Sequence, residues 1–232
     1  MYIISLIPAR SGSKGIKDKN IKEYKGEPLL CHSINISKES KYIKETIVTT
    51  DSEIYKEISE KNGAICPFLR PSEISQDLST DYEFIKHYLE WMKSNNSIVP
   101  ELIVQLRPTY PNRKIEILDD CIEIMMNNKD YTSLRTVVPT DKSPFKMYTT
   151  DINTNKLIPL FEKINDINEP YNLARQQLPK TYLHNGYIDI IRTSSFYQYD
   201  SITGPIIYPY IMDKSETDDI DYIEEWIKSE NK

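Results

Sequence analysis

The segment 9–20 has the residue types of a phosphate-binding loop. It reads ARSGSKGIKDKN, in which Arg10, Lys14 and Lys19 supply positive charge. Gly12 lets the backbone turn its N–H groups toward a bound anion. A cationic, glycine-bearing loop of this kind can hold phosphate, and an ordinary basic surface loop is the alternative interpretation.

Two carboxylates stand near the other end of the chain, in Asp219-Ile220-Asp221. In an extended backbone, residues two apart point to the same side. Such a pair suits Mg²⁺, a hard ion held by one or two carboxylates together with phosphate oxygens and water. The alternative is a polar helix start, because Asp is favoured at the N-cap and in the first turn.

Further candidates could bind an anion or a sugar. Arg70, Arg107 and Arg175 each lie beside a proline or a helix-breaking segment. Arginine offers a bidentate fork to phosphate or carboxylate, although exposed arginines are usually only solvated. Asn185, in His184-Asn185-Gly186, could aim its amide at a sugar hydroxyl or simply form a turn. His184 itself is either a base or a structural histidine.

The surrounding elements would position these residues at one edge of a sheet. Residues 2–7 are β-branched and apolar, which is typical of a buried parallel strand, and the cationic loop follows that strand, where α/β sheets bind ligands. The pattern also predicts strands at 45–50, 64–68, 101–106, 133–138, 186–192 and 205–212, with helices at 27–40, 53–62, 81–93, 114–126 and 221–229. This alternation indicates an α/β fold, a mainly parallel sheet covered by helices.

The pattern changes from about residue 131. Segments 145–150 and 156–161 read as a hairpin, and no helix is expected between them and residue 177. We therefore predict one domain, 1–232, in which residues 140–178 form an inserted β arm.

Composition excludes several classes of protein. Of the 232 residues, 39% are hydrophobic and 28% charged, with a net charge of −6, which argues against a general nucleic-acid binder. We expect no membrane span and no signal peptide, because the longest apolar run is too short for either. Three widely spaced cysteines indicate reduced thiols in the cytoplasm rather than a zinc site. No nucleophile elbow, H-E-x-x-H or Walker A sequence occurs, so covalent catalysis is not expected.

Seven segments follow one another in a recognisable order. They are Ile7-Pro8-Ala9-Arg10-Ser11-Gly12-Ser13-Lys14-Gly15-Ile16 with Lys19-Asn20; Thr49-Thr50-Asp51; Leu69-Arg70-Pro71-Ser72-Glu73 with Asp77; Leu106-Arg107-Pro108-Thr109 with Pro111 and Arg113; Arg175-Gln176-Gln177-Leu178-Pro179; Asn185-Gly186; and Asp219-Ile220-Asp221. Each segment alone is a weak signal. Together, nearly end to end, the chain resembles the acylneuraminate (CMP-sialic acid) cytidylyltransferase family.

The resemblance implies a Rossmann-like nucleotidyltransferase fold of GT-A-like, three-layer type. It also implies transfer of CMP from CTP to a nonulosonic, sialic-acid-like sugar, release of pyrophosphate, Mg²⁺ as cofactor, and a role in surface glycan synthesis. The active form would be a homodimer whose β arm reaches the partner's site.

The resemblance also implies roles for individual residues. Nucleotide binding falls to Ala9, Arg10, Gly12, Asn20 and Arg70. The catalytic groups would be Arg10, Lys14, Lys19 and Asp221, with Mg²⁺ held by Asp219 and Asp221. The acceptor sugar would contact Arg107, Arg175, Gln176 and Asn185, together with Lys146 from the partner's arm.

Three departures from the family pattern concern the acceptor. Arg107 replaces a glutamine, Asn185-Gly186-Tyr187-Ile188-Asp189 replaces Asn-Gly-Ala-Ile-Tyr, and Ala174 replaces a proline. An added arginine charge would favour a more anionic acceptor. One alternative is therefore a sugar-1-phosphate nucleotidyltransferase using CTP or GTP, and a second is a non-catalytic nucleotide-binding protein.

Overall fold

The computed structural model describes residues 1–231 and has a six-stranded sheet at its centre. The strand order is β12-β6-β11-β5-β1-β4. β1 pairs in parallel with β4 and β5, β6 pairs in parallel with β12, and β11 runs antiparallel to its neighbours β5 and β6. The predicted, mainly parallel sheet is confirmed. The strands are β1 (Ile3–Pro8), β4 (Glu45–Thr49), β5 (Leu102–Gln105), β6 (Ser133–Thr140), β11 (Thr181–Arg192) and β12 (Ile207–Ile211).

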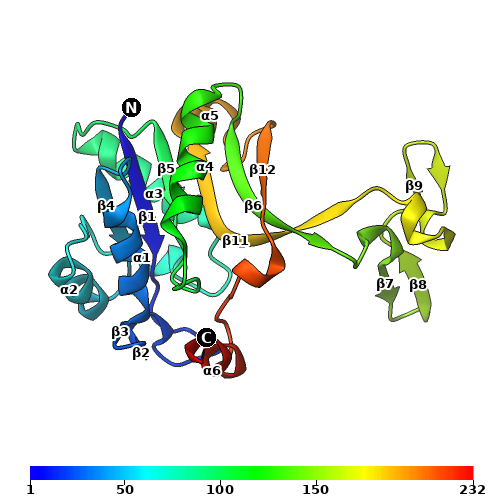
Figure 1. Cartoon of the computed structure of the whole chain (residues 1–232), viewed down its shortest axis with the longest axis horizontal. Coiled ribbons are helices and arrows are strands. Elements are labelled where there is room, and N and C mark those ends of the chain that lie inside the picture. The colour runs from blue at the N-terminus through cyan, green and yellow to red at the C-terminus, as the bar shows by residue number, and fades with distance from the viewer. Residues whose placement is uncertain (232) are drawn as a thin grey trace.

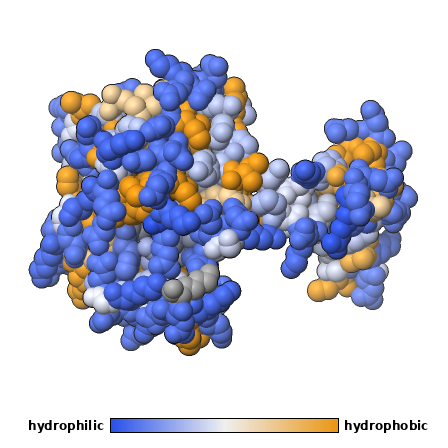
Figure 2. Space-filling view, in the orientation of Figure 1, coloured by the Kyte–Doolittle hydropathy of each residue, from blue (hydrophilic) through white to orange (hydrophobic). Residues whose placement is uncertain are grey.

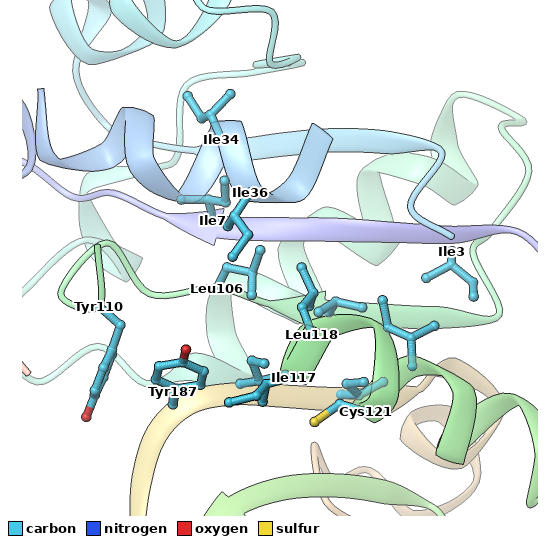
Figure 3. Close-up of a cluster of buried hydrophobic side chains, with 14 of the residues drawn as sticks. Ile3, Ile7, Ile34, Ile36, Leu106, Tyr110, Ile117, Leu118, Cys121 and Tyr187 are labelled. Atoms are coloured by element: carbon cyan, nitrogen blue, oxygen red, sulfur yellow. The ribbon is translucent and has the colours of Figure 1, made fainter. Parts of the chain in front are cut away.

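Helices cover both faces of the sheet, which gives the three layers expected (Figure 1). One face packs against α1 (Leu29–Glu39), α2 (Glu53–Lys61) and α4 (Ile115–Asn127), and Figure 3 shows Ile7, Leu106 and Leu118 in this core. The other face packs against α3 (Asp81–Ser94) and α5 (Thr193–Tyr199). Apolar side chains alternate between the two cores along β1, β4 and β5, as a doubly covered sheet requires.

Some elements differ from the sequence prediction. The expected strand at 64–68 is reduced to isolated bridges that pair Ile65 with Ile47 and Leu69 with Thr50. α5 was not expected, because its sequence TSSFYQY is poor in helix-forming residues. β11 begins at Thr181, five residues earlier than predicted, because its first part pairs with the far end of β6.

Residues 141–180 form an extension between β6 and β11. It contains two hairpins, one of β7 (Tyr148–Asp151) with β8 (Lys156–Pro159) and one of β9 (Lys163–Ile164) with β10 (Ile167–Asn168). Figure 1 shows this arm standing away from the helix-covered sheet, joined to it by the prolonged ends of β6 and β11.

A third, small core joins the two ends of the chain. It contains Ile16 of the cationic loop, Tyr24 and Leu29, together with Ile220 and Trp226 near the C-terminus. The hydroxyls of Tyr24 and Ser229 lie 2.7 Å apart. This core therefore seats α6 (Ile223–Glu230) against the hairpin of β2 (Glu23–Tyr24) and β3 (Glu27–Pro28), below the end of β1 in Figure 1.

Cys31, Cys66 and Cys121 are buried and not bonded to one another. Burial raises the pKa of the Cys31 and Cys66 thiols to about 11. Within residues 1–231, no helix has both the length and the apolar character needed to cross a bilayer.

Candidate active site

A pocket of about 360 Å³ opens at the carboxyl ends of β1 and β5. This is the edge at which parallel α/β sheets bind ligands. Its charged lining consists of five cations and two carboxylates, namely Arg10, Lys14, Lys19, Arg70, Arg107, Asp81 and Asp221. The pocket thus brings together residues of the cationic loop, the segments after β4 and β5, and the C-terminal segment.

Asp51, directly after β4, fixes the start of the cationic loop. Its carboxylate accepts hydrogen bonds from the backbone N–H and the hydroxyl of Ser11, both at 2.7 Å. The Asn20 amide donates to the Arg10 carbonyl at 3.0 Å and holds the loop from its other side. Gly12 has a positive φ of 72°, and Ala9 is buried, so both shape the backbone of the loop. Neither of them lines the pocket.

Asp77 pairs with two of the loop's cations. Arg10 Nη2 lies 2.9 Å from Asp77 Oδ1, and Lys14 Nζ forms an ion pair with the other carboxylate oxygen. The hydrogen bonds from Lys14 and Arg10 lower the pKa of Asp77. Asp77 belongs to the segment matched by sequence resemblance, but no role for it followed from the sequence.

The C-terminal segment closes the pocket from the opposite side. Lys19 Nζ donates to Asp221 Oδ1 at 2.7 Å and to the Ile220 carbonyl at 3.1 Å. A Cβ on Gly15 would collide with the Asp221 carbonyl, so glycine permits this close approach of the two chain ends. Ile220 is fully buried, and its backbone N–H donates to the Thr109 carbonyl at 3.0 Å.

Asp219 lies beside Asp221 and just outside the pocket lining. Desolvation raises its pKa, and the negative charge of Asp221 adds to this shift. Within residues 1–231 no group of three or more His, Cys, Asp or Glu side chains is arranged to hold a metal ion. One or two carboxylates are a donor set that Mg²⁺ can complete with phosphate oxygens and water.

Arg70 forms part of the pocket's floor. It is 5% exposed, donates from Nε to Ser75 Oγ at 2.9 Å and lies over the Phe84 ring. Burial lowers the pKa of its guanidinium, and the carboxylates of Asp51 and Asp81 partly offset that shift. A buried guanidinium at a pocket floor is a fixed donor for a polar ligand.

Arg107 is bound on both sides by carboxylates. Its Nη1 donates to Asp189 Oδ2 at 2.7 Å and to the Gly186 carbonyl at 3.2 Å, and its Nη2 donates to Asp81 Oδ2. The other oxygen of Asp189 lies 2.8 Å from His184 Nε2. Arg107 lines the pocket as a guanidinium whose charge is paired with two carboxylates of the same chain, which its place in the sequence did not show.

Asn185 lies in a bulge of β11 and is bonded within the protein. Its side-chain oxygen accepts hydrogen bonds from Thr136 Oγ1 at 2.6 Å and from the Tyr187 N–H at 3.1 Å. The pairing of β11 with β6 shifts between His184 and Asp189, so the bulge places both side chains near each other. The Asn185 amide does not line the pocket.

The remaining residues expected to contact the acceptor lie on the arm. Arg175 and Gln176 line a separate hollow of about 410 Å³ at the base of the arm. Lys146 donates to the Tyr171 carbonyl at 2.9 Å. Within one chain, the structure thus does not bring these three residues to the pocket.

The sequence matches the family model described as cytidylyltransferase over residues 4–215. The chain belongs to this family of cytidylyltransferases. The residues that line the pocket all fall within the matched region except Asp221 and Tyr222, which lie beyond residue 215.

Individual cytidylyltransferases show the same relationship. An N-acylneuraminate cytidylyltransferase of Escherichia coli is 31% identical over 94% of this chain, which spans about half of that relative's length (49%). A CMP-N,N'-diacetyllegionaminic acid synthase of Legionella pneumophila is 30% identical, and the match covers 99% of this chain and 95% of that relative's length. The solved structure of a CMP:2-keto-3-deoxy-manno-octonic acid synthetase in complex with CTP superposes on this chain with a TM-score of 0.70, at 13% sequence identity. The superposition covers 100% of this chain and 98% of that protein's chain. That superposition supports the nucleotidyltransferase fold.

Proposed function

We propose that the chain transfers CMP from CTP to a nonulosonic, sialic-acid-like sugar and releases pyrophosphate. One observation supports this most directly: a single pocket at the carboxyl edge of the sheet combines Arg10, Lys14, Lys19 and Arg70 with Asp221. Four cations around one cavity suit a triphosphate. The names of the relatives, which include N-acylneuraminate and pseudaminic acid cytidylyltransferases, support the choice of CTP and acceptor.

The chemistry needs positioning and charge stabilisation rather than a covalent intermediate. The acceptor oxygen attacks the α-phosphorus in line, the bond to the β-phosphate oxygen breaks, and negative charge accumulates on the leaving pyrophosphate. Lys14, Lys19 and Arg10 would stabilise that charge, and Arg70 would fix the nucleotide from the pocket's floor. Asp77 forms ion pairs with Arg10 and Lys14, so a triphosphate that binds these two cations would displace the Asp77 carboxylate.

We propose Mg²⁺ as the cofactor, held by Asp219 and Asp221. Mg²⁺ held there would neutralise negative charge on the phosphate oxygens. The negative charge of Asp221 contributes to the raised pKa of Asp219, after desolvation, so the two carboxylates interact with each other. Lys19 holds Asp221 at the edge of the pocket.

We further propose that the active form is a homodimer in which the arm of one chain completes the site of the other. The arm carries exposed apolar side chains, among them Ile152, Leu157, Leu160 and Phe161. Figure 2 shows orange, hydrophobic atoms gathered on this lobe. Apolar side chains left exposed on a projecting arm are typical of a surface that packs against another molecule. Lys146, Arg175 and Gln176 would then reach the partner's pocket.

Pyrophosphate release tests the proposed activity. The protein would be supplied with each of CTP, GTP, ATP and UTP in combination with a panel of nonulosonic acids and sugar 1-phosphates, with Mg²⁺. We expect release only from CTP with a nonulosonic acid. Activity restricted to sugar phosphates would overturn the proposed acceptor, and no release from any pair would support a non-catalytic nucleotide-binding protein.

A further inference from the structure

Arg107 and Asp189 are 82 residues apart in the sequence and contact each other in the structure. Arg107 follows β5, and Asp189 lies in β11, which pairs with β5. Their side chains form an ion pair, with Nη1 2.7 Å from Oδ2. The two side chains thus form one structural unit.

Asp189 is buried and holds two side chains at once. It is 4% exposed, and its two oxygens are taken by Arg107 and by His184, with Arg135 Nε 3.8 Å away. Burial alone would raise its pKa, but the hydrogen bond from His184 and the charge of Arg107 hold the pKa of Asp189 below its ordinary value. The carboxylate is therefore charged at neutral pH.

This arrangement fixes the Arg107 guanidinium as part of the pocket's wall. Gly186 has a positive φ of 74°, and a Cβ there would lie only 3.2 Å from Arg107 Nη1. The glycine leaves room for the guanidinium, and the Gly186 carbonyl accepts a hydrogen bond from it at 3.2 Å. Asp81, at the first turn of α3, holds the opposite edge of the same group and also lines the pocket.

We propose that Asp189 is a positioning and specificity-determining residue, which makes the Arg107 end of the pocket select an uncharged part of the acceptor. At least three N–H groups of Arg107 are bonded to Asp189, Asp81 and the Gly186 carbonyl. A phosphate at this place would have to displace a carboxylate, and it would lie beside the carboxylate of Asp81. A hydroxyl or acylamido group can hydrogen-bond to both the guanidinium and Asp81 without such repulsion. This inference rests on the proposed function, because it concerns the acceptor of that reaction.

Four proteins separate the positioning role from a merely structural one: wild type, Asp189→Asn, Arg107→Gln, and the double variant. Asp189→Asn leaves the wall with an extra positive charge and a loosened guanidinium, so kcat/KM for the nonulosonic acid should fall about 100-fold. The Kd for CTP, measured by calorimetry, should change less than about threefold, because the nucleotide cations are untouched. The double variant removes both charges, so its kcat/KM should be about tenfold higher than that of Asp189→Asn. The exposed Asp130→Asn serves as a matched control that should behave as wild type.

Inorganic phosphate and glucose 1-phosphate are the probes of charge selection. Neither should compete with the acceptor in the wild type, whereas both should inhibit Asp189→Asn by competing with the acceptor. Competition in the wild type, unchanged acceptor kinetics in Asp189→Asn, or a double variant no better than Asp189→Asn would each overturn the inference.

A readout that needs no acceptor keeps this test distinct from that of the proposed function. Nitrogen-15 NMR of the Arg107 side chain should show hindered rotation of the guanidinium in the wild type and free rotation in Asp189→Asn. Free rotation in both proteins would overturn the positioning role. Absence of turnover in the wild type with hindered rotation would instead count against the proposed reaction.

Discussion

Lys19 and Asp221 are 202 residues apart in the sequence and form an ion pair in which Nζ lies 2.7 Å from Oδ1. The lysine also donates to the Ile220 carbonyl at 3.1 Å, so it holds both the backbone and the carboxylate of the C-terminal segment. Because Lys19 and Asp221 both line the pocket, the pair joins the loop after β1 to the opposite wall.

Substitution of Asp221 by asparagine should abolish most of the turnover without unfolding the protein. The variant keeps the shape of the side chain but loses the charge proposed to hold Mg²⁺, so kcat should fall about 100-fold or more. The urea midpoint should stay close to that of wild type, since Asp221 is exposed. Glu224→Gln, which removes a charge from the neighbouring helix, is the control, and near-normal turnover in Asp221→Asn would refute the metal assignment.

Asp77→Asn should tighten the binding of CTP. Asp77 forms ion pairs with Arg10 and Lys14, which are freed when its charge is removed. Exposed ion pairs are weak, so the Kd should fall only about two- to fivefold, and the effect should shrink at high salt. Isothermal titration at two salt concentrations measures this, with Glu73→Gln as the control from the same segment. Weaker binding of CTP by Asp77→Asn would show that Asp77 stabilises the loop rather than competing with CTP for Arg10 and Lys14.

The raised pKa of Asp219 predicts a pH-dependent stability difference. A carboxyl group whose pKa is higher in the folded state stabilises the fold at acid pH, and that contribution is lost as pH rises through the folded-state pKa. Asp219→Asn should therefore be more stable than the metal-free wild type at pH 7, and the advantage should disappear as pH falls below about 4. Urea unfolding with a chelator, repeated from pH 4 to 8, checks the sign. A variant less stable than wild type at pH 7 would contradict it.

Mixing two inactive variants tests whether the arm acts on the partner chain. Lys146→Ala damages the arm, and Asp221→Asn damages the pocket. After subunit exchange, about half of all dimers contain one chain of each variant. If sites are completed across the dimer, each of these has one intact site out of two, so about a quarter of the wild-type activity should return. A mixture that stays inactive, while size-exclusion chromatography shows exchange, would place Lys146 and Asp221 in the same chain's site.

The sheet was predictable because its strands carry local signals. Runs such as residues 2–7 and 101–106 are mainly apolar, and the helices between them have clear periodicity. The segment 64–68 has similar composition, yet it forms only isolated bridges beside β4, because the pairing partner decides whether a strand forms. The helix α5 begins directly after β11, where packing of Phe196 into the core overrides weak helix propensity.

The candidate site was predictable to a lesser degree. Loop cations are visible as residue types, so Arg10, Lys14 and Lys19 were found and do line the pocket. Two carboxylates that hold the loop were seen only as parts of motifs: Asp51, which accepts hydrogen bonds from Ser11, and Asp77, which pairs with Arg10 and Lys14. Nothing local in the sequence shows which distant group a carboxylate will meet. The pairing of Arg107 with Asp189 depends on a bulge in β11 and on the antiparallel register with β5, and neither is encoded within one segment.

The small core shared by Ile16, Ile220 and Trp226 has a consequence for protein synthesis. Most of the sheet can assemble once β12 has left the ribosome, but the small core that holds the loop after β1 has only Ile16, Tyr24 and Leu29 until residues 220–226 follow. On a nascent chain, Lys19 lacks Asp221 and the pocket lacks one wall. The wall that faces the loop is therefore made 202 residues later than Lys19, and the pocket is complete only after both segments are present.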